Sequence, residues 1–228
     1  MNKTDIEWTD YTWNPVTGCK HGCPYCYARN MYHRFGWNWE PTLHPERLRQ
    51  PLEKKSSKKI FVGSVTDLFG DWVHREWWEL IFDTVKVCSW HTFQFLTKNP
   101  KRLQELNPWP DNCWVGVTAT NQKMWNSAVL HLGKVDAKVK FLSVEPLLEP
   151  IRMKENPWID WLIIGALSKG KEKVQPPGEM VDNLIADARE HDIAIFTKDN
   201  LSDYNIKEYP NSRNGSNGPN CGKQFTIF

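Results

Sequence analysis

The stretch CWVGVTATNQKMWNSAVLHLGKVDAKVKFLSV, residues 113–144, contains one complete unit of the fold. Its two ends, 113–118 and 139–144, are short apolar runs rich in β-branched side chains, as expected of strands that are buried on both faces. Residues 121–132 between them have the spacing of apolar side chains that is typical of an amphipathic helix. A strand, a helix and a second strand predict two parallel strands joined by a right-handed crossover.

The same alternation recurs along most of the chain. Further apolar runs lie at 59–65, 93–97, 161–167 and 193–197, and further helical patterns lie at 75–88, 99–106 and 179–191. One more strand is expected upstream, around Thr12–Asn14. We therefore predict an α/β fold, a partial (β/α) barrel of about six to seven parallel strands. A flat, doubly wound sheet is the alternative that this alternation leaves open.

The domain organisation follows from where the alternation stops. We predict a single domain over residues 1–228, with no repeat at a period of about 20–50 residues. A segment at about 34–58 interrupts the pattern with prolines and a run of lysines, and we interpret it as an inserted loop. The tail at about 211–224 is rich in Asn and Gly, which predicts a turn or a mobile segment.

Composition limits the class of protein. The net charge of +2 is too small to indicate a nucleic-acid-binding protein by itself. No apolar run reaches the roughly 18 residues of a membrane span, and the polar N-terminus does not resemble a secretory signal. We therefore expect a cytoplasmic protein with reduced thiols and no membrane partner. The 13 Trp residues are expected to pack in the core rather than form a base-stacking surface, because no basic stripe lies beside them.

Polar side chains follow the predicted strands, where parallel barrels carry their chemistry. Glu145 comes directly after the run 139–144 and precedes Pro146, which favours an extended backbone and a carboxylate that faces the barrel mouth. Lys98 follows the run 93–97, and Lys198 follows 193–197; each is either an active-site cation or a surface charge. We predict Glu145 and Lys98 as catalytic residues. A single Ser, Thr, Asn or Asp at a strand end can also serve as a helix cap. The prediction of a site therefore depends on polar residues at the ends of several neighbouring strands, and not on any one of them.

Three cysteines lie within eight residues in the segment GCKHGCPYCYARN, which begins at Gly18. Cys19, Cys23 and Cys26 have the spacing C-x3-C-x2-C. A structural zinc site takes four ligands, and His21 could supply the fourth, although it is only two residues from Cys19 and from Cys23. A [4Fe–4S] cluster is normally held by four Cys, so three thiolates leave one iron open to a small ligand. An amino acid could bind there through its amine and carboxylate.

The other cysteines have no such spacing. Cys88 lies in a helical pattern and Cys113 at the start of a strand, so both are expected to be small buried hydrophobic side chains. Cys221 lies in the Asn/Gly-rich tail, without a partner at metal-ligand spacing.

The cysteine motif, with Tyr25 before its last Cys, resembles that of the radical S-adenosylmethionine (SAM) enzymes. The segments TWNPVTGC, CYARN, VTDLFGDW, FQFLTKNP, WVGVTATNQ and FLSVEPLLEPI narrow the match. They resemble a small phage- and prokaryote-associated radical SAM family of largely unassigned substrate, from about Trp8 to about Lys198. The sequence departs from the superfamily pattern at Gly63-Ser64-Val65, where Gly-Gly-Glu is usual, and at Gly165-Ala166.

The resemblance implies a set of site residues. Cys19, Cys23 and Cys26 would ligate three irons of a [4Fe–4S] cluster. Tyr25 would lie near the adenine, the segment after the second strand would bind the methionine amine, and later strand ends would bind the ribose and the carboxylate. The residues assigned to SAM in this way are Tyr25, Gly63, Ser64, Val65, Thr66, Asp67, Thr118 and Ser143, with Glu145 beside them.

The resemblance also implies the reaction. The enzyme would reductively cleave SAM to a 5′-deoxyadenosyl radical, which abstracts hydrogen from an unknown substrate; we favour a nucleic-acid or nucleotide target. DNA photoproduct-lyase-like repair is one option. It would require a hydrogen-donating Cys at the barrel mouth; Cys113 faces the other end, which leaves Cys221 in the tail as the candidate. An external reductant such as flavodoxin or ferredoxin would be required. The alternative from another class is a non-catalytic zinc- or cluster-binding protein that acts as a nucleic-acid or protein interaction module.

Overall fold

The strands expected from the sequence form one sheet in the computed structural model, which describes residues 1–170 and 172–210. The strand order is β1-β2-β5-β6-β7-β8-β9-β12, and β1 alone in this sheet runs antiparallel to its neighbour. The strands of this sheet are β1 (Asn2–Lys3), β2 (Tyr11–Trp13), β5 (Lys59–Val62), β6 (Thr92–Thr97), β7 (Cys113–Thr118), β8 (Val139–Val144), β9 (Trp161–Ile164) and β12 (Ala194–Thr197).

Two short antiparallel pairs and several helices complete the described part of the chain. The pairs are β3 (Val16–Thr17) with β4 (Thr42–Leu43), and β10 (Leu167–Lys169) with β11 (Glu172–Val174). The α-helices are α1 (Tyr27–Phe35), α2 (Arg75–Val87), α3 (Gln122–Leu132) and α4 (Gly178–Glu190). The 3-10 helices are η1 (Pro45–Arg47), η2 (Gln50–Glu53) and η3 (Pro100–Leu106).

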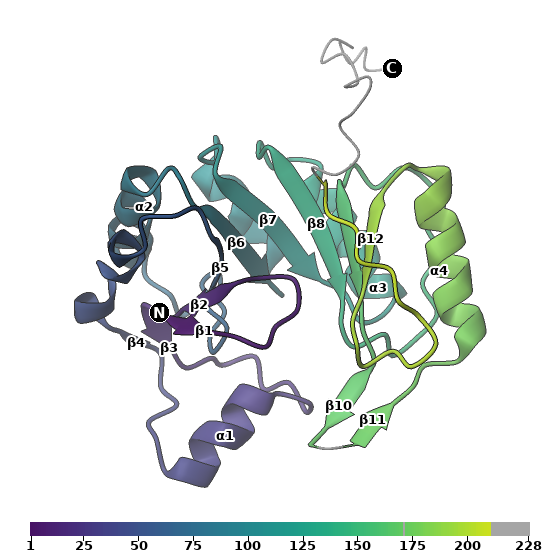
Figure 1. Ribbon diagram of the computed structural model, residues 1–228, viewed down its shortest axis with the longest axis horizontal. Coiled ribbons are helices and arrows are strands. Elements are labelled where there is room, and N and C mark those ends of the chain that lie inside the picture. Colours follow the sequence, from purple (N-terminus) through teal and green to yellow (C-terminus); the bar gives the residue numbers. More distant parts are fainter. Residues whose placement is uncertain (171, 211–228) are drawn as a thin grey trace.

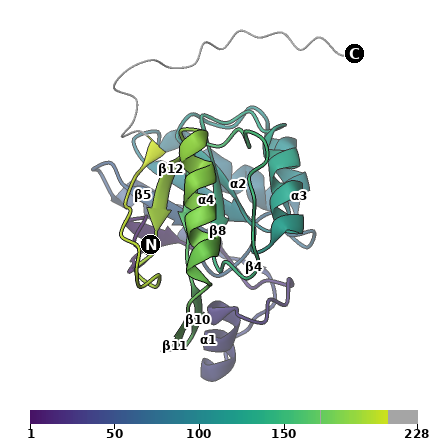
Figure 2. The same ribbon diagram turned by 90° about the vertical axis from the view of Figure 1, so that its right-hand side faces the viewer.

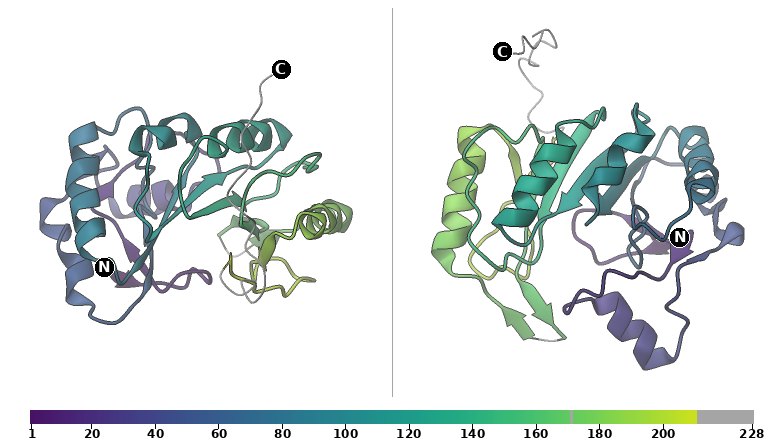
Figure 3. Two further views of the ribbon diagram at one scale, coloured as in Figure 1. Left: turned by 90° about the horizontal axis from the view of Figure 1, so that it is seen from above. Right: turned by 180° about the vertical axis from the view of Figure 1, so that it is seen from behind.

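The strand order argues against the doubly wound sheet, the alternative that the sequence left open. From β2 to β12 the parallel strands follow one another across the sheet in chain order. A doubly wound sheet would reverse direction at a switch point and carry helices on both faces. Instead α2, α3 and α4 lie along one face, while α1 and the β10–β11 pair lie beyond the carboxyl ends of the strands (Figures 1 and 3). The α/β prediction with a mostly parallel sheet is confirmed, and closure into a partial barrel stays a prediction.

Some predicted segments differ in detail from the structure. The pattern at 99–106 forms η3, a 3-10 helix, and the expected inserted loop at 34–58 contains β4, η1 and η2. The single-domain organisation stays a prediction. The predicted Asn/Gly-rich tail, with Cys221, lies outside the described residues. Within the described residues, no helix is both long and apolar enough to cross a membrane.

Apolar side chains cover both faces of the sheet. The larger cluster lies between the sheet and its helices and includes Ile81, Val115 and Leu184. The second cluster, on the opposite face, is mostly aromatic and contains Phe141 and Trp161. Cys88 and Cys113 are fully buried, as expected from the sequence. The prediction that Trp residues pack in the core holds for Trp8, Trp13, Trp78, Trp109, Trp114, Trp125 and Trp161.

The second cluster depends on one glycine. Gly116 in β7 pairs with Phe141 in β8, and a Cβ at Gly116 would lie 2.3 Å from the Phe141 ring. We therefore expect Gly116→Ala to lower the free energy of unfolding by about 1–3 kcal/mol, because the ring has to leave its packed position. Gly133→Ala is the control: Gly133 has helical backbone angles and nothing closer than 3.4 Å to its Cβ position. Urea unfolding measures both, and equal effects of the two substitutions would contradict the packing argument.

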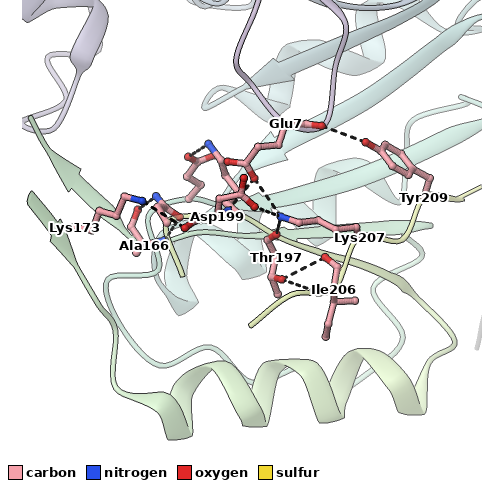
Figure 4. A network of polar contacts seen from close by, with 11 residues as sticks. Glu7, Ala166, Lys173, Thr197, Asp199, Ile206, Lys207 and Tyr209 are labelled. Atoms are coloured by element: carbon pink, nitrogen blue, oxygen red, sulfur yellow. Dashed lines mark hydrogen bonds and ion pairs between the residues drawn. The ribbon is translucent and has the colours of Figure 1, made fainter. Parts of the chain in front are cut away.

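The loop between β1 and β2 is tied to the far end of the sheet by a polar network (Figure 4). Glu7 accepts hydrogen bonds from the backbone N–H of Asp199 (2.9 Å) and from Nζ of Lys207 (3.4 Å). Lys207 also donates to Asp199 Oδ1 (2.6 Å). These contacts join the first loop to the segments that follow β12. They thereby hold Ile6 and Trp8, the two neighbours of Glu7, in the wall of the cavity described next.

Candidate active site

A cavity of about 390 Å³ lies at the carboxyl ends of the parallel strands. Its wall is formed by the ends of β5, β6, β7 and β8, by the residues after β9 and β12, and by the cysteine loop, residues 18–26. All the residues that the sequence predicted for the site line this cavity: Cys19, Cys23, Cys26, Tyr25, Gly63, Ser64, Val65, Thr66, Asp67, Lys98, Thr118, Ser143 and Glu145. The fold brings these positions together, while their chemical roles stay predictions.

The cysteine loop begins at a glycine that no other residue could replace without strain. Gly18 has a φ of +85°, and a Cβ there would lie 2.4 Å from the carbonyl oxygen of Trp39 and 2.5 Å from that of Glu40. The carbonyl oxygen of Gly18 accepts a hydrogen bond from Thr66 Oγ1 at 2.6 Å. The loop is therefore held on one side by backbone of the segment after α1, and on the other by the segment after β5.

We expect Gly18→Ala to displace the cysteine loop. The left-handed φ costs about 1–2 kcal/mol for a residue with a Cβ, and the backbone contact adds to that cost. Gly22→Ala is the matched control, because Gly22 also has a positive φ of +67° but nothing closer than 3.9 Å to its Cβ position. The midpoint temperature of thermal unfolding and the iron content after reconstitution should both fall further in Gly18→Ala than in Gly22→Ala. Equal losses in the two variants would show that the close approach to Trp39 and Glu40 is unimportant.

The three motif cysteines are partly exposed toward the cavity and form no disulfide. Cys26 is the N-cap of α1, and its Sγ accepts a hydrogen bond from the backbone N–H of Arg29 at 3.4 Å. A helix N-terminus stabilises a thiolate, the form that binds metal. Burial, assisted by the charge of Asp67, raises the pKa of the Cys19 thiol to about 11, so metal binding at Cys19 has to release a proton.

The donor set fits a [4Fe–4S] cluster better than a single zinc ion. Within residues 1–170 and 172–210, no three His, Cys, Asp or Glu side chains are close enough to share one metal ion. A zinc ion binds its thiolates at about 2.3 Å from one centre and so needs them close together, whereas each iron of a cluster takes its own thiolate. The zinc site considered for Cys19, Cys23, Cys26 and His21 is therefore not preformed.

His21 contacts Asp67 instead of completing a metal site. Its Nε2 lies 2.7 Å from Asp67 Oδ2, and its ring packs edge-on against Trp72 at 4.9 Å. Asp67 is almost completely buried and also accepts hydrogen bonds from Thr97 Oγ1 and from the backbone N–H of Lys98. Burial acts to raise the pKa of the Asp67 carboxyl, but the hydrogen bonds from His21 and its other donors outweigh it and hold the pKa below its usual value. The His21–Asp67 pair thus fastens the cysteine loop to the ends of β5 and β6.

The segment 63–67, assigned to SAM by resemblance, also supports the cysteine loop and α1. Ser64 exchanges hydrogen bonds with the Asn14 side chain, and its carbonyl oxygen accepts one from Tyr27 in α1 at 2.8 Å. The side chains of Thr66 and Asp67 contact Gly18 and His21, as described above. Much of the hydrogen-bonding capacity of these side chains is therefore already used. Backbone groups of this segment are used as well: the Gly63 N–H donates to the carbonyl oxygen of Trp13, the Gly63 carbonyl oxygen accepts from the Thr66 N–H, and the Val65 N–H donates to Asn14 Oδ1.

Thr118 and Ser143 present hydroxyl groups to the cavity from neighbouring strands. They pair across β7 and β8, and both are buried. Neither hydroxyl has a hydrogen-bond partner among the residues that the structure describes. Two adjacent buried hydroxyls that face a cavity are suited to bind a polar ligand. Tyr25 lies nearby on the cysteine loop; burial raises its pKa to about 12, and its hydroxyl interacts with Thr120.

Two lysines, Lys98 and Lys198, and two carboxylates, Asp67 and Glu145, line the cavity. Glu145 Oε1 forms an ion pair with Lys198 Nζ at 2.6 Å, and both side chains are largely buried. A Cβ at Gly165 would lie 3.0 Å from Glu145 and 3.2 Å from Lys198, so the small residue makes room for the pair. Lys98 also lines the cavity, and its ammonium group has no carboxylate partner among the described residues.

Sequence reasoning missed several members of this site. His21 was considered only as a metal ligand, and Lys198 was left between an active-site cation and a surface charge. Asn200, which exchanges two hydrogen bonds with the backbone of Ala166, and Trp39, which lines the cavity wall, were not considered. The partners of these residues are distant in sequence, so no local motif marks them.

Comparisons with known proteins agree with the fold. The structure of a cysteine-to-serine mutant of spore photoproduct lyase matches this chain with a TM-score of 0.60 and 12% identity. The match covers 86% of this chain and 78% of the lyase chain. The complex of that lyase with dinucleoside spore photoproduct covers the same shares, with a TM-score of 0.59 and 11% identity. A double mutant with bound AdoMet and dinucleoside spore photoproduct covers 73% and 58%, with a TM-score of 0.51 and 12% identity. The chain therefore has the fold of a radical SAM enzyme.

Sequence comparison gives a family but no reaction. The family model described as "Protein of unknown function (DUF5131)" matches residues 3–218. No curated protein matches the sequence.

Proposed function

Because the family match spans most of its length, the chain belongs to the DUF5131 family, and we propose that it is a radical SAM enzyme. The observation that carries this proposal is the placement of Cys19, Cys23 and Cys26. They line one cavity at the carboxyl ends of a parallel sheet, in a fold shared with spore photoproduct lyase. Three thiolates would hold three irons of a [4Fe–4S] cluster and leave the fourth open to the amine and carboxylate of SAM.

The rest of the cavity would hold the remainder of SAM. The hydroxyls of Thr118 and Ser143 offer hydrogen bonds to its ribose and methionine parts, and residues 63–65 line the same cavity. The Glu145–Lys198 pair supplies charges of both signs. When bound, the cluster supplies the electron that cleaves SAM into methionine and a 5′-deoxyadenosyl radical, which takes a hydrogen atom from the substrate.

The protein contributes orientation and protection to this chemistry. Ile6, Trp8, Phe61 and Leu96 give the cavity an apolar wall that excludes water and other hydrogen donors. Cys19, Cys23 and Cys26 lie on a loop that Gly18 and the His21–Asp67 pair hold in place. Glu145 and Lys98 line the cavity, and in this proposal they bind the substrate or exchange a proton with it.

We propose a nucleic-acid-derived substrate, because two of the solved neighbours have dinucleoside spore photoproduct bound. Repair of a photoproduct with Cys88 or Cys113 as the hydrogen donor is not favoured, and Cys221 lies outside the described residues. Cys113 starts β7 at the amino end, and neither Cys88 nor Cys113 lines the cavity. We further propose a cytoplasmic location and an external reductant such as flavodoxin or ferredoxin.

Electron paramagnetic resonance (EPR) spectroscopy tests the proposal. Protein purified without oxygen, reconstituted with iron and sulfide and reduced with dithionite should show a [4Fe–4S]+ signal that shifts when SAM is added. It should then release 5′-deoxyadenosine and methionine in equal amounts. A colourless protein with one zinc ion per chain would instead support the non-catalytic binding module. A cluster signal that is indifferent to SAM would leave a cluster protein without SAM chemistry.

A further inference from the structure

Exposed aromatic side chains gather on α1 and the segment that follows it. Phe35 and Trp37 are 57% and 54% exposed, and their rings stack with centroids 5.0 Å apart at an interplanar angle of 24°. Helix α1 lies beyond the carboxyl ends of the strands, away from the helices that cover the sheet (Figures 1 and 2). Large aromatic side chains usually bury their area, so a stacked pair in water indicates a binding surface.

The exposed pair continues as a row of rings toward the cavity. Trp37 contacts Tyr32 with ring centroids 5.3 Å apart, and Tyr32 contacts Trp39 at 4.9 Å. Trp39 lines the cavity that holds the three motif cysteines. We call Phe35, Trp37, Tyr32 and Trp39 the aromatic ladder. It extends from solvent to the wall of the candidate active site.

The charges on α1 and beside Phe35 and Trp37 are basic, and Glu40, which follows Trp39, forms an ion pair with Lys20 at 3.0 Å. Residues 27–39 contain Arg29, His33 and Arg34 and no Asp or Glu. The guanidinium of Arg34 lies 5.8 Å from the centre of the Phe35 ring. A groove of about 350 Å³ beside Tyr32 and Trp37 is also lined by His44 and Arg47, whose nearest carboxylate is that of Glu46 at 3.2 and 3.5 Å. Rings with basic groups beside them are complementary to an anion that carries flat, apolar faces.

Other exposed aromatic side chains of the described surface lack this arrangement. They are Tyr27, which is on α1 itself, and the separate Trp90 and Trp158. Trp90 donates a hydrogen bond to the carbonyl oxygen of Lys54, and Trp158 has no ring partner among the described residues. The expectation that the Trp residues pack in the core is therefore wrong for Trp37, Trp90 and Trp158, which are exposed. The basic residues beside Trp37 lie on the adjoining helix, not in a continuous stripe.

We propose that the aromatic ladder is a docking surface for single-stranded DNA, which stacks its bases on Phe35 and Trp37 and passes its target nucleotide to the cavity. Stacking needs base faces that a duplex hides, whereas the cations need only the phosphates. The ring faces would stack on bases and the cations would contact phosphates. Neither contact involves a 2′-hydroxyl. The proposal rests on the proposed function for the step into the cavity, but the docking itself does not require SAM chemistry.

Fluorescence anisotropy with the cluster-loaded, full-length protein tests the docking. The probe is a labelled oligothymidine of about 12 nucleotides. Wild-type protein should bind it more tightly than the same sequence as a duplex, and at least as tightly as the same sequence as RNA. Phe35→Ala with Trp37→Ala should weaken binding by about 10- to 100-fold. Trp158→Ala, which removes an exposed ring elsewhere, should bind like wild type.

Two further variants distinguish stacking from other contacts. Trp37→Leu keeps apolar bulk and removes the ring face, so it should weaken binding about 10-fold. Arg34→Ala should lower the slope of log affinity against log salt by about 1. Iron content and circular dichroism equal to wild type establish that each variant is folded, and the single variants serve if the double variant fails to fold.

Several outcomes would overturn the inference. One is unchanged binding by the folded ladder variants, and another is tighter binding of duplex or RNA than of single-stranded DNA. A third is self-association of the wild type that Trp37→Leu abolishes in sedimentation velocity, which would make the ladder a contact between copies. Production of 5′-deoxyadenosine by wild-type protein without oligothymidine binding would remove the docking and keep the proposed function. Binding of oligothymidine without SAM cleavage would keep the docking surface and contradict the proposed function.

Discussion

Cys23→Ala is expected to abolish the [4Fe–4S]+ EPR signal and the release of 5′-deoxyadenosine. Cys23 is the middle cysteine of the motif, and its side chain lines the same cavity as Cys19 and Cys26. Two thiolates leave two irons of the cluster without protein ligands, so the iron bound after reconstitution should fall to less than about a tenth of wild type. The measurements are iron content, EPR with and without SAM, and the yield of 5′-deoxyadenosine.

Cys88→Ala is the matched control for this prediction. Cys88 is buried among apolar side chains at the end of α2, outside the cavity. The variant loses one thiol as Cys23→Ala does, but it should keep the cluster signal and the SAM-dependent shift. Full iron content in Cys23→Ala, or equal losses in both variants, would show that the motif does not ligate iron.

Cys23→Ala also separates the enzyme from the alternative binding module. A zinc protein that uses its thiolates only to stabilise a fold would lose stability in this variant without any change in SAM chemistry. In the proposed enzyme the variant loses SAM cleavage, while the sheet far from the cysteine loop stays folded. The far-ultraviolet circular dichroism should therefore stay close to wild type.

The sheet could be predicted from the sequence because its strands are buried on both faces. Runs such as 113–118 and 139–144 are mostly apolar, and β7 and β8 begin and end at these residues. Their carboxyl ends had to meet at one edge, so polar residues after separate strands could be assigned to one site. That reasoning needs only local patterns and the handedness of the crossover.

The contacts inside the site could not be predicted in the same way. Asp67 follows Gly63, Ser64, Val65 and Thr66 in the sequence and was assigned to SAM with them. The structure shows its carboxylate bound to His21, 46 residues away. Glu145 pairs with Lys198, 53 residues away, rather than with Lys98. Which polar groups are already satisfied depends on the three-dimensional arrangement, and a strand-end motif does not reveal it.

The aromatic ladder illustrates a second limit. Trp37 and Trp39 lie in a segment with no apolar periodicity. The burial of these two residues could therefore be predicted only from the general tendency of Trp to pack in the core. Most Trp residues of the chain are buried, which made core packing the reasonable expectation. Exposure of Trp37 follows from the position of α1 outside the sheet, and the sequence contains no local signal for that position.

Asp67→Asn is expected to be among the most destabilising substitutions in the cysteine-loop region. Asp67 Oδ1 accepts hydrogen bonds from the backbone N–H of Phe69 (2.9 Å) and from Thr97 Oγ1 (2.7 Å). Oδ2 accepts from His21 (2.7 Å) and from the backbone N–H of Lys98 (2.8 Å). An amide keeps one acceptor oxygen and points N–H groups at the two donors on its other side. Leaving these donors unpaired should cost about 3–5 kcal/mol of the free energy of unfolding.

Urea unfolding of the cluster-free protein measures this loss, with Asp71→Asn as the control. Asp71 is an exposed carboxylate four residues downstream that accepts from Asn99, so the same substitution there should leave the unfolding midpoint nearly unchanged. Equal midpoints for the two variants would contradict the anchoring role of Asp67. The cost should also appear in function, because the loop that carries Cys19 and Cys23 would lose its attachment through His21. Reconstituted Asp67→Asn should therefore bind less iron, which Asp71→Asn should not.

The loss of unfolding free energy in Asp67→Asn should depend on pH in a definite direction. The pKa of the Asp67 carboxyl is lowered in the folded protein, because the hydrogen bonds from His21 and its other donors outweigh the opposing effect of burial. A carboxyl of this kind binds fewer protons folded than unfolded, so its stabilising effect is complete above the unfolded pKa, about 3.9, and is lost as the pH falls through the lower, folded value. The difference between wild type and Asp67→Asn should therefore be constant near neutral pH and shrink below about pH 4. A difference that grew on acidification would mean that Asp67 is protonated in the native protein, and would leave His21 without an anionic partner to hold the cysteine loop.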